Sequence, residues 1–314
     1  MGKYQGSSRS FNTLKHSNRA ERSKRRVQSK YLILSICAVI IAILLALMVF
    51  AVMAIAHKGS SKAPAETSGD KEIAFKEATF ASEDAGKGNL LLVNAQHKYS
   101  FFEGTSLVSA SSVSTPGCVQ NSSILVNAEA LAAYDSMMKK YVEVFGESDI
   151  WLVEAYRTEA EQANKQFAPG YSDHHTGRLL TIKQKNGSDL SADNWLYQNC
   201  YKYGFVVRYP ETKSMQTGVS GYTYAFRYVG IPHATYMQEH SLCMEEYIVL
   251  LQNNYSSGET LKFTAADGNR YAVYSVKAAT SGATTLSVPS ALPYTISGDN
   301  AGSFVITVTL GKAE

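Results

Sequence analysis

The sequence predicts an α+β protein that follows a single transmembrane helix and ends in a small all-β module. Three observations support this prediction: residues 31–56 carry no charged side chain, helical and strand patterns alternate over residues 86–255, and helical periodicity is lost after residue 255. We therefore expect a basic cytoplasmic tail (1–30), a transmembrane helix (31–56), a linker (57–85), an α+β domain (86–255) and a β module (256–314).

The first 30 residues are strongly basic, with nine Lys or Arg side chains against one acidic residue, Glu21. The apolar run that follows would form a helix about 39 Å long, more than the roughly 30 Å of a bilayer's hydrocarbon core. Positive charge before a span favours a cytoplasmic N-terminus. We therefore expect a single-pass plasma-membrane protein whose C-terminal domains lie outside the cytoplasm.

Two features of this region have a second interpretation. The tripeptide at residues 54–56 resembles a signal-peptidase site, but the apolar run is about twice as long as a signal-peptide core, which favours an uncleaved anchor. The basic tail is also compatible with contact to anionic lipid or nucleic acid. It contains no binding motif, so we expect it to orient the span, with no nucleic-acid partner.

The clearest element of the α+β domain is a helix over residues 127–146, where apolar side chains recur at helical spacing between an Asn and a Gly. The pattern further predicts helices over 160–167, 193–204 and 242–254, and strands over 89–95, 150–156, 178–184, 205–210 and 224–230.

The β module is predicted from five β-type runs separated by Gly-containing turns, at 261–265, 270–276, 284–288, 294–298 and 303–310. Three cysteines follow the span, Cys118, Cys200 and Cys243. This odd number is compatible with one disulfide and a free thiol, or with three buried apolar side chains.

Several stretches occur in the order of a known family: "LLLVN", "AYRTEAEQ", "SDHHTG", "NCYKYGFVVRYP", "FRYVG" and "MEEYI". From about residue 89 to 254 the chain resembles the membrane-anchored D-alanyl-D-alanine carboxypeptidases of the vancomycin-resistance type. These are LAS-type zinc peptidases that cut peptidoglycan stem peptides. The resemblance implies a central antiparallel sheet and a place on the bacterial cell surface, facing the cell wall.

The resemblance also implies which residues would form a zinc site. In the family pattern S-x-H-x-x-G-x-A-x-D the His and Asp bind zinc, and in E-P-W-H-x-R-Y-V-G the His is the third ligand and the Glu is the general base. His174 keeps the first ligand position, whereas Thr181 and Ala225 stand at the other two, and Tyr222 stands at the base position. We therefore expect a remnant ligand at His174, no catalytic residue and no bound cofactor.

Neighbouring residues are not expected to rebuild the site. On an extended segment, successive side chains point to opposite sides, so His175 and Asp173 would point away from His174. Leu179 replaces the small residue of the family pattern and Tyr224 its Trp. These larger or neutral side chains predict a filled cavity, which avoids leaving polar groups unsatisfied in the absence of metal.

Three residues match positions that hold substrate in the family: Arg157, Gln162 and Ser172. Arg157 has an alternative interpretation as an ion-pair partner of Glu154 or Glu245, and Ser172 as a turn cap. The sequence leaves both interpretations open.

The leading hypothesis is a catalytically inactive surface protein, a pseudoenzyme, that binds wall peptide or another surface protein. The alternative is an active zinc D,D- or L,D-carboxypeptidase that trims stem peptides. A third hypothesis assigns binding to the β module, through an exposed strand edge or face, with the central domain as a spacer.

Overall fold

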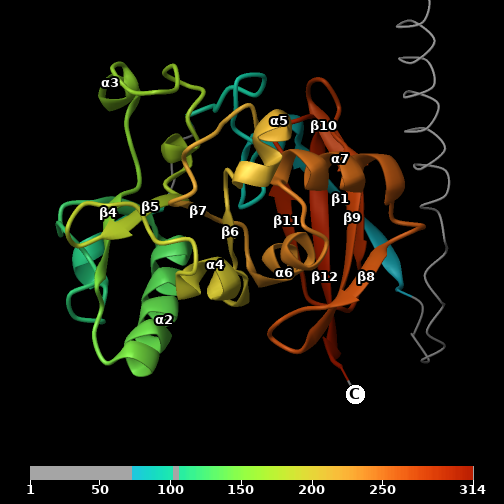
Figure 1. The fold of residues 1–314 in the computed structure, drawn as a ribbon. Coiled ribbons are helices and arrows are strands. Elements are labelled where there is room, and N and C mark those ends of the chain that lie inside the picture. The colour runs from blue at the N-terminus through green and yellow to red at the C-terminus, as the bar shows by residue number, and fades with distance from the viewer. Residues whose placement is uncertain (1–72, 102–105, 314) are drawn as a thin grey trace, which may run out of the picture. The chain divides into compact units, whose positions relative to one another are not determined.

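The computed structural model describes residues 73–101 and 106–313 (Figure 1). The predicted tail and transmembrane helix lie outside these residues. Within the described ranges, no helix combines the length and hydropathy that a membrane span requires. The described residues belong to one compact unit.

The centre of the first half is a four-stranded antiparallel sheet with the strand order β4-β5-β7-β6, which confirms the antiparallel sheet implied by the family resemblance. Its strands are β4 (Ile150–Glu154), β5 (Leu179–Gln184), β6 (Phe205–Val207) and β7 (Ala225–Tyr228). All four lie within or overlap strands predicted from the sequence.

Helix α2 (Ala128–Phe145) confirms the predicted helix. The side chain of Asn127 accepts hydrogen bonds from the first free backbone N–H groups, and Gly146 ends the helix with a φ of 84°. The apolar face of α2, with Leu131 and Met138, packs in one core with Leu152 and other side chains of the central sheet.

The other elements of this half are short or follow the sheet. They are β2 (Leu107–Ser109) paired with β3 (Leu125–Asn127), α3 (Glu159–Gln162), α4 (Trp195–Asn199), α5 (Ser214–Thr217), α6 (Ile231–Glu239) and α7 (Met244–Asn254), with 3₁₀ turns η1 (Ser82–Gly86), η2 (Ala110–Ser112), η3 (Asp173–Thr176), η4 (Cys200–Tyr203) and η5 (Glu211–Lys213). The sequence prediction missed α5 and α6 and made α3 too long. Cys118, Cys200 and Cys243 are buried free thiols, as in the second alternative above.

The predicted strand at residues 89–95 is wrong, although Leu90 to Val93 are fully buried. Their backbone groups bond to side chains and loops instead of a neighbouring strand. Arg227 and Arg208 donate to the carbonyls of Leu91 and Val93. The N–H of Leu92 donates to the carbonyl oxygen of Asp299, in the turn that follows the strand at residues 294–298. The apolar run thus predicted correctly that these residues are buried. Their backbone groups do not form the hydrogen bonds of a strand.

The C-terminal half contains a second antiparallel sheet in the order β11-β12-β9-β8, with β8 (Leu261–Thr264), β9 (Asn269–Lys277), β11 (Tyr294–Gly298) and β12 (Ser303–Lys312). The remaining strand, β10 (Ala283–Pro289), pairs along its length with β1 (Phe75–Ala81). This corrects the predicted linker at 57–85, because its residues 75–81 form a strand. Ala78 and Phe80, two apart on that strand, pack on the core beneath β10 and β12.

The C-terminal sheet shares its core with the first half. Val273 of β9 and Val305 of β12 pack in one cluster with Met237 of α6 and Tyr247 of α7. Helix α7 therefore lies against the sheet, as Figure 1 also shows.

Candidate functional site

The four positions that would form the family's zinc site meet in one place. Thr181 on β5 and Ala225 on β7 are direct partners across the sheet. Tyr222 precedes β7 by three residues, and His174 lies in the turn η3 before β5. All four side chains are buried. The mapping made from the motifs therefore agrees with the fold.

A chain of hydrogen bonds joins three of these residues. The Nδ1 atom of His174 bonds to the carbonyl oxygen of Ala155, which can only accept, so Nδ1 carries the proton. Nε2 of the neutral ring is then an acceptor, and the hydroxyl of Tyr222 donates to it at 2.7 Å. The hydroxyl of Thr181 lies 3.2 Å from the Tyr222 oxygen and can donate to it. Every polar group in this chain has a partner.

The hydrogen bonds of His174 show whether these four residues could hold a metal ion. The Nδ1–H to carbonyl bond is typical of a metal-binding histidine and leaves Nε2 as the ligand atom. In this structure Tyr222 takes that lone pair. Thr181 and Ala225 offer neither carboxylate nor imidazole, so the residues present do not fit the family's zinc site. Among residues 73–101 and 106–313, no three His, Cys, Asp or Glu side chains are grouped to hold a metal ion.

Aromatic side chains fill the space in front of these groups. Tyr222 stacks on Tyr209 with ring centroids 5.5 Å apart, and Phe167 stacks on Tyr209 at 5.7 Å. Leu179 and Ala225 complete the same buried cluster. Phe167 and Tyr209, which were not named from the sequence, therefore pack with Leu179, Tyr222 and Ala225 at this place.

Removing the Tyr222 hydroxyl tests this network. In Tyr222→Phe, the Nε2 atom of His174 loses its hydrogen-bond donor inside the protein. We therefore expect the free energy of unfolding to fall by about 1–3 kcal/mol. Chemical denaturation of the variant measures the change. Tyr224→Phe is the matched control, because no hydrogen bond joins the Tyr224 hydroxyl to another described residue, and it should stay within about 0.5 kcal/mol of wild type. Equal free energies of unfolding for Tyr222→Phe and Tyr224→Phe would contradict the hydrogen bond from Tyr222 to His174.

His175 does not converge with His174, but the reason differs from the one predicted. The two histidines lie in a 3₁₀ turn rather than an extended segment. His175 donates from Nδ1 to the carbonyl of Arg157 at 2.7 Å and accepts at Nε2 from the N–H of Gly170 at 2.9 Å. Both ring nitrogens are therefore used in holding the loop around η3.

Asp173 belongs to a buried ion network that the sequence analysis missed. Its two carboxylate oxygens each lie 2.8 Å from an arginine Nε, one from Arg208 and one from Arg227, and all three side chains are fully buried. Arg208 also pairs with Glu245 at the start of α7 at 2.8 Å. The network ties η3 to β6, β7 and α7, and thus holds His174 in place. The only sign of this network in the sequence is that Arg208 and Arg227 each lie within a predicted strand.

Arg157 pairs with Glu154, as the structural alternative proposed, and donates from Nη1 to the Oε1 atom of Gln162 at 3.0 Å. Gln162 in turn donates to the carbonyl of Phe167 at 2.8 Å. Ser172 caps η3 by accepting from the N–H of His174 at 3.4 Å. The structure thus brings the three predicted substrate-binding residues close to His174 but gives each a partner within the protein.

A hollow of about 460 Å³ adjoins Arg157, and we call it the Arg157 hollow. It lies between β3, the end of β4 and α3, and its charged lining residues are Glu154, Arg157, Glu161 and Lys165. Burial raises the pKa of Glu154, but hydrogen bonds from Arg157 outweigh this, so the net pKa is lowered and the carboxylate is charged. The hollow therefore presents both signs of charge.

Buried histidines make stability depend on pH. Burial lowers the pKa of His174 to about 4 and that of His233 to about 3. Because both values lie below the roughly 6.5 of an unfolded chain, the unfolded state binds protons first as the pH falls. The stabilisation is complete above pH 6.5 and is lost below it, by about 2 kcal/mol per histidine at pH 5.

Urea denaturation at pH 7.5, 6 and 5 should therefore show falling free energies of unfolding. His240→Gln should leave this profile unchanged, because His240 is exposed and directly follows α6. A free energy that is constant between pH 7.5 and 5 would contradict the burial of neutral histidines.

Comparisons with known proteins agree with the arrangement of the motifs. The sequence profile "VanY: D-alanyl-D-alanine carboxypeptidase" matches residues 124–231. A D-alanyl-D-alanine carboxypeptidase of Enterococcus faecium is 30% identical over 267 residues, covering 79% of this chain and 83% of that protein. The bifunctional D-Ala-D-Ala dipeptidase and carboxypeptidase VanXYC of Enterococcus gallinarum is 35% identical over 127 residues, covering 32% of this chain and 67% of that protein.

Among solved structures, the vancomycin-resistance D,D-dipeptidase VanXYg in complex with a D-Ala-D-Ala phosphinate analogue is similar, with a TM-score of 0.66 and 25% identity. The match covers 75% of this chain and 99% of that one. A VanY D,D-pentapeptidase mutant in complex with Zn(II) matches 51% of this chain with a TM-score of 0.42.

Proposed function

The chain belongs to the VanY family of D-alanyl-D-alanine carboxypeptidases, and on this premise we propose that it is a catalytically inactive member that binds peptidoglycan stem peptide. The observation that carries the proposal is the hydroxyl of Tyr222, which donates to the Nε2 atom of His174 and so occupies the lone pair a metal would need.

The chemistry of the family cannot proceed with the residues present. Zinc peptidases need a metal with an open position for water and a base of suitable pKa. Thr181 and Ala225 supply no ligand, and the base position holds a phenol. Burial raises the pKa of Tyr222 further, so this hydroxyl does not act as a base near neutral pH.

Peptide binding is assigned to the Arg157 hollow. A stem peptide ends in a carboxylate and offers backbone N–H and carbonyl groups. Arg157 and Lys165 supply positive charge for the carboxylate, and Glu154 and Glu161 supply acceptors for N–H groups. Charged groups of this kind form the stronger hydrogen bonds in protein sites. The hollow lies beside the closed site, so binding there does not require zinc.

The proposed setting is the outer face of a bacterial plasma membrane. A single span at residues 31–56, with the basic tail in the cytoplasm, would hold the peptidase-like domain beside the cell wall. The proposed partners are accordingly the membrane, through one span, and stem peptide or another surface protein.

Binding and turnover can be measured on the full chain in detergent micelles. We expect a pentapeptide ending in D-Ala-D-Ala to bind saturably, without release of D-alanine even when zinc is added. Lys165→Ala should weaken binding severalfold and Arg157→Ala should abolish it, whereas Lys139→Ala, on the exposed side of α2, should change nothing.

Each other outcome would overturn part of the proposal. Release of D-alanine that is lost in His174→Ala would make the protein an active carboxypeptidase. Absence of peptide binding would reject the Arg157 hollow and leave a protein scaffold as the function. Because the C-terminal sheet shares its core with α6 and α7, point variants test these outcomes better than deletion of residues 258–314.

A further inference from the structure

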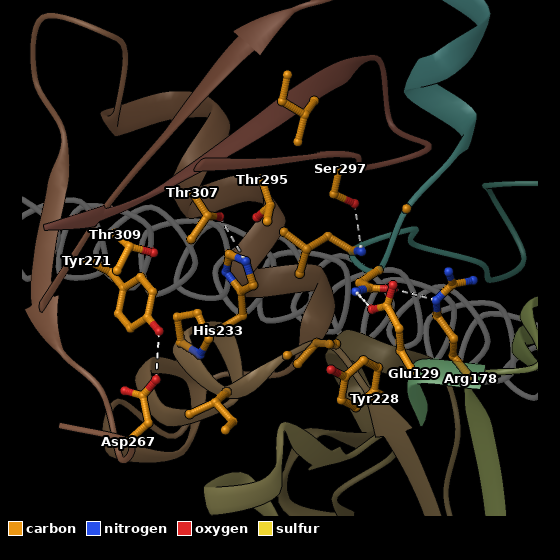
Figure 2. A pocket seen from close by; sticks show the side chains of 18 residues that line it. Glu129, Arg178, Tyr228, His233, Asp267, Tyr271, Thr295, Ser297, Thr307 and Thr309 are labelled. Carbon is orange, nitrogen blue, oxygen red and sulfur yellow. Dashed lines mark hydrogen bonds between the residues drawn. The ribbon is translucent and has the colours of Figure 1, made fainter. Parts of the chain in front are cut away.

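A second pocket, about 530 Å³ in volume, lies where the peptidase-like half meets the C-terminal sheet (Figure 2). We call it the Arg178 pocket. Its walls come from residues 88–90, from Glu129 at the start of α2, from Arg178 just before β5, from residues 228–233 at the end of β7 and the start of α6, and from strands β9, β11 and β12. Its volume falls in the range of small-molecule sites, roughly 300–1,000 Å³.

One end of the pocket holds a cation and an anion that do not touch. Arg178 donates from Nε to Asn89 at 2.7 Å, and Asn89 donates to Glu129 at 2.8 Å, so an amide stands between the two charges. Figure 2 shows Glu129 and Arg178 next to one another along one wall. Burial, together with the nearby charge of Arg227, lowers the pKa of Arg178 to about 10, so the guanidinium is still charged at neutral pH.

Three hydroxyl groups that line the pocket have unused bonding capacity. No hydrogen bond joins the hydroxyls of Tyr228, Thr295 and Thr309 to another described residue, and Figure 2 labels all three around the cavity. Each hydroxyl can both donate and accept.

Other polar lining groups already have partners. His233 uses both ring nitrogens, on Tyr247 and Thr307. Tyr271 donates to Asp267 at 2.7 Å, and the charge of Lys312 lies near that carboxylate. Arg178 also donates from Nη1 to the carbonyl oxygen of Thr176 at 3.3 Å. The groups left for a ligand are thus the Nη2 group of Arg178, the carboxylate of Glu129 and three hydroxyls.

This combination selects a class of ligand. A small anion attracted to Arg178 would meet Glu129, and a small cation attracted to Glu129 would meet Arg178. A neutral molecule with several hydroxyl groups can accept from the guanidinium and donate to the carboxylate at once, while its apolar face lies on Ile231 and Pro232. We propose that the Arg178 pocket binds a neutral saccharide of one or two rings. The proposal concerns a site separate from the Arg157 hollow and does not depend on peptide binding.

Calorimetric titration of the full chain tests the proposal with four probes: glucose, N-acetylglucosamine, its β-1,4-linked disaccharide and sodium acetate. At least one neutral sugar should bind saturably with a millimolar or lower dissociation constant. Tyr228→Phe and Thr309→Val each remove one hydroxyl with little change of shape, and each should raise that constant about fivefold to tenfold. Arg178→Gln should raise it by more.

Lys76→Gln, on exposed β1 outside the pocket, is the matched control and should leave binding unchanged. Thermal unfolding of every variant shows whether a loss of binding reflects a loss of fold. The proposal fails if no neutral sugar binds, or if the sugar affinity is the same in Tyr228→Phe, Thr309→Val and wild type. Acetate binding tighter than any sugar, and dependent on Arg178, would show an anion site instead.

Discussion

A variant that carries the family residues again is expected to bind about one zinc ion per chain. The substitutions are Thr181→Asp, Tyr222→Glu and Ala225→His, with Leu179→Ala to restore the small side chain of the family pattern. Thr181 and Ala225 face each other across β5 and β7, so an Asp and a His at these positions would lie within about 4.5–5.5 Å at their Cβ atoms. His174 already presents Nε2 toward the same point, because the Tyr222 oxygen lies 2.7 Å from it and 3.2 Å from Thr181.

Zinc content after dialysis measures this expectation, and a chromophoric chelator gives the affinity. The same variant with His174→Ala is the control and should retain little zinc, since one of three ligands is missing. If the restored variant folds and still binds no zinc, the assignment of these four positions to one former metal site is wrong.

Asp173→Asn is expected to destabilise the fold by roughly 3–5 kcal/mol. The substitution keeps the shape of the side chain but removes the charge between Arg208 and Arg227, and both guanidinium groups are fully buried. Glu245 still offsets part of the charge of Arg208, whereas Arg227 loses its carboxylate partner within the described residues. Leaving a buried charge without its partner is among the largest effects a single substitution can have.

Chemical denaturation compares this variant with Asp189→Asn. Asp189 also forms an ion pair, with Lys183 at 3.0 Å, but it is half exposed. Exposed pairs contribute little, so this control should lie within about 1 kcal/mol of wild type. Similar losses in the two variants would show that the buried network does not stabilise the fold.

The sequence predicted most of the fold, because its periodic patterns coincide with buried faces. Helix α2 has a capping residue at each end and apolar side chains at helical spacing. The C-terminal strands lie between turns that contain glycine. The failure at residues 89–95 has a physical cause. An apolar run reports burial, and the side-chain hydrogen bonds from Arg208 and Arg227 that replace a strand partner are not visible in sequence.

The sequence predicted which residues lie at the candidate site, but it did not predict the hydrogen bonds among them. Motif spacing grouped His174, Thr181, Tyr222 and Ala225, and the structure pairs Thr181 with Ala225 and bonds Tyr222 to His174. That these positions form a former metal site stays a prediction. The phenol of Tyr222 reaches His174 because of the path that the chain takes between β6 and β7. Motif spacing does not predict this path. The role of Asp173 was missed for a similar reason, since its partners lie 35 and 54 residues away in sequence.

The most direct test of an inactive site is a zinc titration of the wild-type chain at pH 7.5 in competition with a chromophoric chelator. The Tyr222–His174 hydrogen bond predicts no stoichiometric zinc, and the same result in wild type and His174→Ala. His97, whose Nδ1 atom bonds to the side chain of Asn94, serves as the control position. One tightly bound zinc per chain that is lost in His174→Ala but kept in His97→Ala would contradict an inactive site.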